Sequence, residues 1–182
     1  GVGTTTFTGT TQTIPAGVTY TNVTVTGPSV SFGVGTTAIG GTLTVTGTGA
    51  SLDLAGQTVT VSGSLSTASG GVLRQAAGTL TVAGAATFQG GDETGLLTGG
   101  VLSVGGNFTQ IFFSVPTSFV ASTAHKVVLN GPGAQVVNFG SPGATNSRFQ
   151  DLEIANAAGV SFSSTSAAAN GTVTVTTGTV TG

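Results

Sequence analysis

The sequence predicts an all-β protein, specifically a single-stranded parallel β-helix (β-solenoid) of about nine rungs with a period near 20 residues. Three observations support this prediction. Apolar residues alternate with Thr or Ser, a short phrase containing this alternation recurs along the chain, and no long window shows the apolar spacing of an amphipathic helix.

The alternation defines two faces for each expected strand. Side chains of a β-strand point to opposite sides in turn, so residues two apart share a face. The apolar residues of each phrase share one face and the intervening Thr or Ser residues share the other, as shown by the pairs Val23/Val25, Leu43/Val45, Val59/Val61, Leu80/Val82, Leu102/Val104, Leu152/Ile154 and Val173/Val175. Val and Thr are stiff, β-branched residues that suit a pleated surface.

The recurrence selects a solenoid over an antiparallel sandwich. The phrases TVTG, TVTG, TVSG, TVAG and SVGG recur at a somewhat variable spacing and end at Gly27, Gly47, Gly63, Gly84 and Gly106. In a stack of coils, equivalent positions lie over one another, so like residues recur as ladders; a sandwich gives no reason for consecutive strands to resemble each other. We expect these phrases to stack as one ladder, with the closing Gly turning the corner at positive φ.

The whole chain, residues 1–182, is predicted to be one solenoid domain. Residues 107–153 form a section of it that is richer in Phe and Pro and includes the apolar run QIFFSVPTSFV at 110–120. One interpretation is a wider coil that needs larger side chains inside. The other is an exposed aromatic docking patch made of Phe112, Phe113 and Phe119.

Composition excludes several classes of function. Charged residues make up 4% of the chain and the net charge is −2, so a nucleic-acid interface is not expected. The absence of Cys excludes disulfides and thiolate metal sites. The sequence contains no apolar run of membrane-spanning length and no signal peptide. We expect an extracellular or cell-surface location, because a Thr-, Ser- and Gly-rich surface offers few cleavage points to proteases.

The chain resembles secreted bacterial β-solenoid surface proteins, such as filamentous-haemagglutinin-like adhesins and other repetitive cell-surface proteins. The resemblance covers the phrases at 23–27, 43–47, 59–63, 80–84 and 102–106, and the block HKVVLNGPGAQVVNFGSPGATNSRFQDLEIANAAGVSF at 125–162. It implies a role in attachment, matrix or filaments and brings no catalytic residues.

No enzymatic activity, cofactor or metal is expected. Asp92 and Glu93 lie in a Gly-rich segment predicted to be a solvated loop, with too few oxygens for Ca²⁺. Asp151 and Glu153 share a strand face, and two carboxylates placed in this way are similar to the acid pair of a glycosidase. A glycosidase groove also needs basic and aromatic partners around the acids, so we expect a surface pair near Arg148 instead. The single His, His125, is predicted to lie in a turn. The N-x-T sequons begin at Asn22, Asn107 and Asn170.

Paired Thr residues suggest a further alternative. They would place methyl and hydroxyl groups in a regular array that resembles the Thr-x-Thr face of ice-binding solenoids. The residues of this candidate Thr face are Thr24, Thr26, Thr44, Thr46, Thr58, Thr60, Thr79 and Thr81.

The favoured function is a structural one. Both terminal sequences alternate like strands and show no charged cap, so we expect subunits to join end to end or by donating a strand, giving a self-assembling surface filament or matrix fibre. The expected subunit contact comprises Val173, Val175, Val180, Phe7 and Ile14. The partner is therefore the protein itself, with surface polysaccharide as a further partner. The alternative is a segment of a long adhesin that binds host or polysaccharide surfaces.

Overall fold

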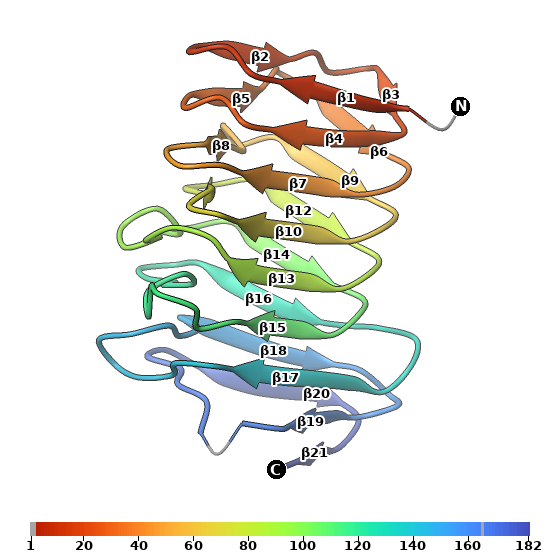
Figure 1. Ribbon diagram of the computed structural model, residues 1–182. Coiled ribbons are helices and arrows are strands. Elements are labelled where there is room, and N and C mark those ends of the chain that lie inside the picture. The colour runs from red at the N-terminus through yellow and green to blue at the C-terminus, as the bar shows by residue number, and fades with distance from the viewer. Residues whose placement is uncertain (1–2, 165) are drawn as a thin grey trace.

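The computed structural model describes residues 3–164 and 166–182, and in these residues the chain winds into a stack of parallel β-coils with no helix (Figure 1). The described strands form three parallel sheets. Sheet A contains, in spatial order, β1 (Thr4–Phe7), β4 (Asn22–Val25), β7 (Leu43–Thr46), β10 (Leu65–Ala68), β13 (Ala86–Gln89), β15 (Phe108–Gln110), β17 (Gln135–Phe139), β19 (Val160–Phe162) and β21 (Val180–Thr181).

The other two sheets complete the coil. Sheet B is short and contains β2 (Gln12–Ile14), β5 (Val30–Phe32), β8 (Ser51–Asp53) and β11 (Val72–Arg74). Sheet C contains β3 (Thr19–Tyr20), β6 (Thr36–Ile39), β9 (Thr58–Val61), β12 (Thr79–Val82), β14 (Val101–Val104), β16 (Lys126–Leu129), β18 (Asp151–Ala155) and β20 (Val173–Thr177). Each turn of the chain adds a strand to sheet A and then one to sheet C.

The predicted parallel β-solenoid is confirmed, with about eight turns and a period near 22 residues. The period exceeds the expected value because the middle coils are longer. In an early coil Val23 pairs with Leu43, whereas in a middle coil Phe108 pairs with Val137 after a distinctly longer stretch of chain. The extra residues lie in the connections between the strands of sheets A and C.

The recurrent phrases do not form one ladder, which corrects the expected alignment. The first two belong to β4 and β7 of sheet A, whereas the next three belong to β9, β12 and β14 of sheet C. The spacing between Gly47 and Gly63 is short because the phrase moves from sheet A to sheet C within this interval. Both sheets repeat the same alternation because both have an apolar inner face and a hydroxyl outer face, so the phrase alone does not distinguish them.

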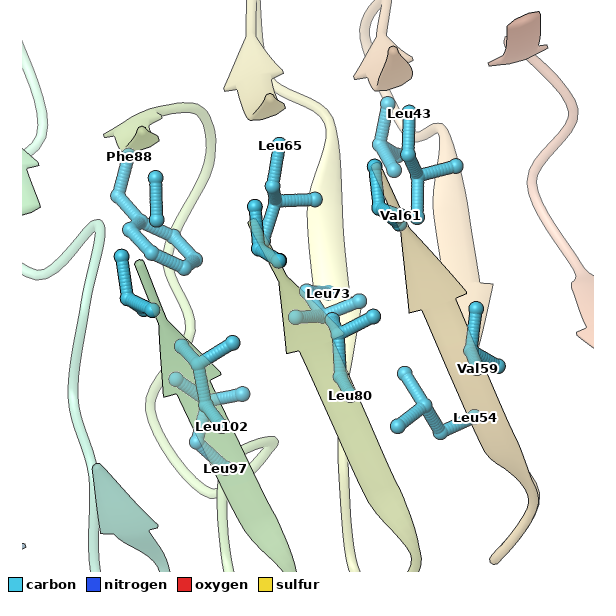
Figure 2. Close-up of a cluster of buried hydrophobic side chains, with 14 of the residues drawn as sticks. Leu43, Leu54, Val59, Val61, Leu65, Leu73, Leu80, Phe88, Leu97 and Leu102 are labelled. Carbon is cyan, nitrogen blue, oxygen red and sulfur yellow. The ribbon is translucent and has the colours of Figure 1, made fainter. Parts of the chain in front are cut away.

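The core is a set of apolar ladders between the sheets. Figure 2 shows Val59, Leu80 and Leu102 side by side in consecutive coils of sheet C, and all three side chains are fully buried. Burying each such side chain contributes about 1.5–3 kcal/mol. The same inner face continues through Val127 and Leu152 toward the C-terminal end.

Phenylalanine fills the longer coils of residues 107–153. The buried rings of Phe88, Phe108, Phe119, Phe139 and Phe149 pack in tilted and edge-to-face pairs, with centroids 4.6 Å apart for Phe88 and Phe119 and 5.0 Å apart for Phe108 and Phe149. A longer coil encloses a wider interior, and these rings occupy it at the dense packing typical of protein cores.

Four of the five glycines that close the phrases allow close approach of the preceding coil rather than a positive φ, so the expectation is correct for Gly47 and wrong for the others. Of the glycines that close the phrases, Gly47 has a φ of 111°, but Gly63, Gly84 and Gly106 do not lie in the positive-φ region. These three stack directly, since the Gly84 N–H donates to the Gly63 oxygen at 2.8 Å and the Gly106 N–H donates to the Gly84 oxygen at 2.9 Å. A Cβ at these positions would collide with the backbone of the preceding coil.

Candidate functional site

The C-terminal coil leaves an apolar face without cover. Val173 and Val175 of β20 pair in register with Leu152 and Ile154 of β18, which are 3% and 0% exposed. Val173 and Val175 continue that inner ladder but are 54% and 49% exposed, and Val180 is 45% exposed. Three of the five residues expected in a subunit contact therefore form an open end of the core.

The N-terminal end is closed by its own side chains, which corrects the expectation for Phe7 and Ile14. Ile14 is fully buried and Phe7 is 9% exposed, so neither presents a side chain for contact with another subunit. The Phe7 ring packs edge-on against the Tyr20 ring at 6.2 Å, and the Tyr20 hydroxyl donates to the Pro15 carbonyl at 3.2 Å. The backbone edges of β1 and β3 still begin sheets A and C at this end.

The candidate Thr face is divided between two sheets. Thr24 and Thr44 pair in sheet A, where Thr26 and Thr46 follow them, whereas Thr58 and Thr60 pair with Thr79 and Thr81 in sheet C. The eight residues therefore do not form one array. The strand register instead shows a longer ladder of hydroxyl side chains on the outer face of sheet A, which the alignment of the sequence phrases did not predict. Its members are Thr6, Thr24, Thr44, Ser66, Thr87 and Thr109.

Asp92 and Glu93 are adjacent in sequence but lie in opposite environments. Asp92 is exposed to solvent, and its Oδ1 accepts hydrogen bonds from the Thr94 hydroxyl at 2.6 Å and from the Thr94 backbone N–H at 2.9 Å. The bond from the hydroxyl is the main cause of the lowered pKa of the Asp92 carboxyl. Glu93 is fully buried, and its Oε1 accepts the Leu73 N–H at 3.0 Å on the free edge of β11. Burial raises the pKa of the Glu93 carboxyl well above its usual range. The predicted solvated loop is thus wrong for Glu93, which caps the edge of sheet B.

Asp151 and Glu153 both face outward from β18, but each is engaged separately. Glu153 forms an ion pair with Lys126 of the adjacent β16, and Asp151 Oδ1 accepts the Thr172 N–H at 2.8 Å. Arg148, the cation expected near this pair, donates from Nη1 to the Asn146 carbonyl at 3.0 Å. The two carboxylates therefore hold neighbouring coils together. Within residues 3–164 and 166–182, no group of three or more His, Asp or Glu side chains is placed to hold a metal ion.

His125 is a core residue, although it also follows a turn. Its side chain is fully buried, and its ring packs edge-on against Phe119 at 6.0 Å. The Gln75 Nε2 donates to the Val101 carbonyl, so the Gln75 Oε1 is the acceptor that faces His125 Nε2 at 3.2 Å. Nε2 therefore carries the proton, and burial lowers the pKa of His125 to about 4.

We expect this histidine to make the protein less stable in mild acid. Because the folded-state pKa is about 4 and the unfolded value is 6.5, the unfolded chain binds the proton first as the pH falls. The contribution of His125 is present above pH 6.5 and is lost as the pH falls through 4, a change of about 3 kcal/mol in the free energy of unfolding. This change in the free energy of unfolding is measured by urea unfolding of the untagged protein at a series of pH values, from neutral pH to below the folded-state pKa of His125.

The matched variant is His125→Gln, which removes the only His of the chain. The difference in unfolding free energy between the two proteins should change by about 3 kcal/mol across this pH range. Parallel pH profiles for the two proteins would contradict the assignment.

The connections from sheet A to sheet C gather on one side of the coil stack, the left in Figure 1, and are called the loop side here. A hollow of about 450 Å³ lies there, and six of the residues that line it are Thr48, Ser69, Gln89, Phe113, Ser114 and Val115. Three successive coil corners form its floor. The segment 111–118, which follows β15, forms its wall.

The aromatic residues of this segment separate into core and surface. Phe119 is fully buried among Phe88 and Phe108, which corrects its place in the predicted docking patch. Phe112 and Phe113 are 52% and 81% exposed and remain available at the surface. Strand periodicity is lost in this connection, so the sequence alone did not separate the three rings.

No protein-family model matches this chain. No curated protein and no solved structure shows significant similarity to it. None of the described residues forms a helix long and apolar enough to cross a membrane. Function is therefore inferred from the chain's own geometry: an open apolar end, a largely uncharged surface and a hollow on the loop side.

Proposed function

We propose that this chain is a structural subunit of an extracellular β-solenoid fibre, in which the C-terminal end of one copy receives the N-terminal end of the next. The observation that carries the proposal is the exposure of Val173, Val175 and Val180, of which the first two continue a ladder that is otherwise buried. An additional coil would remove these side chains from water and stabilise the contact.

The backbone supports the same contact. β20 and β21 are the last strands of sheets C and A, and β3 and β1 are the first strands of the same two sheets. Free strand edges offer unpaired N–H and C=O groups that pair readily with another strand. A second copy would place its β3 beside β20 and its β1 beside β21, continuing both sheets.

The sizes of the end coils also match. At the N-terminal end Thr4 pairs with Asn22, and at the C-terminal end Val160 pairs with Val180, so the coils at both ends are short. The wide coils, such as the one that joins Phe108 to Val137, lie between them. Because the contact joins two different surfaces and does not close on itself, it generates a linear filament.

The composition suits a fibre outside the cell. Only eight of the residues are Lys, Arg, Asp or Glu, and two ion pairs, Arg74–Asp53 and Lys126–Glu153, use four of them. Such a surface changes little with salt or pH, because few groups on it are charged or titrate.

The contact is tested by introducing charge at the open end. We expect the unmodified protein to form particles that grow with concentration in light scattering and appear as filaments in electron micrographs. The double variant Val173→Glu, Val175→Glu should remain monomeric, because burying two unpaired carboxylates in the contact is strongly unfavourable.

The control is Val34→Glu, one such substitution at a valine that is 92% exposed and lies between β5 and β6, away from the C-terminal face. It should assemble like the unmodified protein. An unmodified protein that stays monomeric at high concentration, or equal assembly of the double variant, would refute the filament proposal.

The second candidate is a segment of a long adhesin. The hollow on the loop side favours it, because insertions that collect on one face of a solenoid often form its binding face. In that case a further coil of the same polypeptide would cover Val173 and Val175, and the isolated chain would not polymerise through its N-terminal strands.

A further inference from the structure

We propose that the hollow on the loop side is a binding site for a neutral saccharide, with Phe113 as its stacking platform and Gln89 among its hydrogen-bonding groups. This inference is independent of the filament contact, since the hollow lies on the side of the coil stack and the open valines lie at its end.

The hollow is held open by a fixed wall. The Ile111 N–H donates to the Phe88 carbonyl at 2.9 Å, and the Gln110 Nε2 donates to the Ser118 hydroxyl at 2.9 Å. Between these points, the Thr117 carbonyl accepts the Glu93 N–H at 2.9 Å and the Pro116 carbonyl accepts the Ser147 hydroxyl at 2.7 Å. The segment 111–118 is anchored at both ends, which lowers the cost of ordering it when a ligand binds.

The residues that line the hollow suit a polar, uncharged ligand. Thr48, Ser69 and Ser114 contribute hydroxyls and Gln89 a carboxamide, and no residue of the described chain forms a hydrogen bond with these four side chains. None of the described residues that line the hollow is charged. Phosphate, carboxylate and amine ligands would therefore lose hydration without gaining a partner of opposite charge.

The exposed ring narrows the ligand class further. Phe113 is 81% exposed on the wall of a hollow whose floor is polar. The face of an aromatic ring is electron-rich and attracts polarised C–H groups. A pyranose presents a face of C–H groups on one side and hydroxyls around its rim, which matches a ring beside hydroxyls and a carboxamide.

Size and backbone pairing argue against a peptide. The volume of about 450 Å³ lies in the range of small-ligand pockets and suits one or two sugar rings. A peptide that bound as an added strand would need a free sheet edge. The strands that end at this hollow, β7, β10 and β13, lie inside sheet A and already pair on both sides.

The test is affinity electrophoresis of the protein in gels that contain neutral polysaccharides of glucose, mannose, galactose or N-acetylglucosamine, with the matching free sugars as competitors. We expect retardation by at least one of these gels and its reversal by the free sugar. Phe113→Ala and Gln89→Ala should each weaken the apparent affinity at least tenfold.

The matched control is Phe112→Ala, which removes a neighbouring exposed ring that does not line the hollow. It should keep the retardation of the unmodified protein. The proposal is overturned if no neutral polysaccharide retards the unmodified protein, or if Phe112→Ala weakens binding as much as Phe113→Ala, which would indicate a general apolar patch. The light-scattering assay tests the filament contact independently of saccharide binding.

Discussion

Phe108→Ala is expected to lower the free energy of unfolding by about 3–5 kcal/mol, the cost of removing a large aromatic side chain from a packed core. Phe108 is fully buried and its ring contacts those of Phe88, Phe119, Phe139 and Phe149, with centroids between 4.8 and 5.6 Å away. Its loss would leave a cavity that the four surrounding rings, which belong to three successive coils, cannot all relax to fill. Urea unfolding followed by circular dichroism measures the change.

Phe113→Ala is the matched control, because it makes the same substitution nearby in the chain at a ring that is 81% exposed. Its effect should stay within about 0.5 kcal/mol, as for most surface substitutions. Comparable losses in both variants would show that the rings of this section do not divide into core and surface as described.

Gly106→Ala is expected to cost about 2–4 kcal/mol, through overpacking and distortion of a backbone hydrogen bond. An added Cβ would lie 2.6 Å from the Ala85 nitrogen and 2.6 Å from the Gly84 carbonyl carbon. These are backbone atoms of the preceding coil and cannot move aside alone. The Gly106 N–H also donates to the Gly84 oxygen at 2.9 Å, so a shift would weaken the contact between the coils.

Gly133→Ala provides the comparison. A Cβ there meets no atom within 4 Å and the residue does not lie in the positive-φ region. The substitution should be neutral or stabilising by up to about 1 kcal/mol, because alanine restricts the unfolded chain. If Gly106→Ala is equally well tolerated in urea unfolding, close stacking is not the reason for glycine at this corner.

The success and failure of the sequence predictions follow from the range of the interactions involved. The alternation around Val23 and Leu102 is local, since side-chain direction in a strand depends on the backbone alone, and it correctly separated inner from outer residues. The same local pattern occurs in sheets A and C. The prediction from this pattern therefore put Thr44 and Thr58 in one ladder, although the two residues belong to different sheets.

The candidate sites were harder to predict, because they depend on contacts between coils. Phe113 and Phe119 lie in one apolar run without strand periodicity, yet one is exposed and the other is buried among rings from other coils. Glu93 has the sequence context of a solvated loop, yet its carboxylate is buried at the edge of β11, where it accepts the Leu73 N–H. Phe7 and Ile14 have terminal positions, but they close the N-terminal end of the core.

The sequence by itself determined the β-class, the inner and outer faces of each strand and the stacking of coils, because period-two alternation and recurrence are properties of the chain read in order. The tertiary structure decided which coil corner each residue occupies, which rings fill the widened interior and which remain at the surface. It also decided where a hollow forms, since a hollow needs residues as far apart as Thr48 and Phe113 to meet. Those pairings depend on the exact length of every intervening coil. The coils differ widely in length, because Thr4 and Asn22 are joined by a short coil and Phe108 and Val137 by a long one.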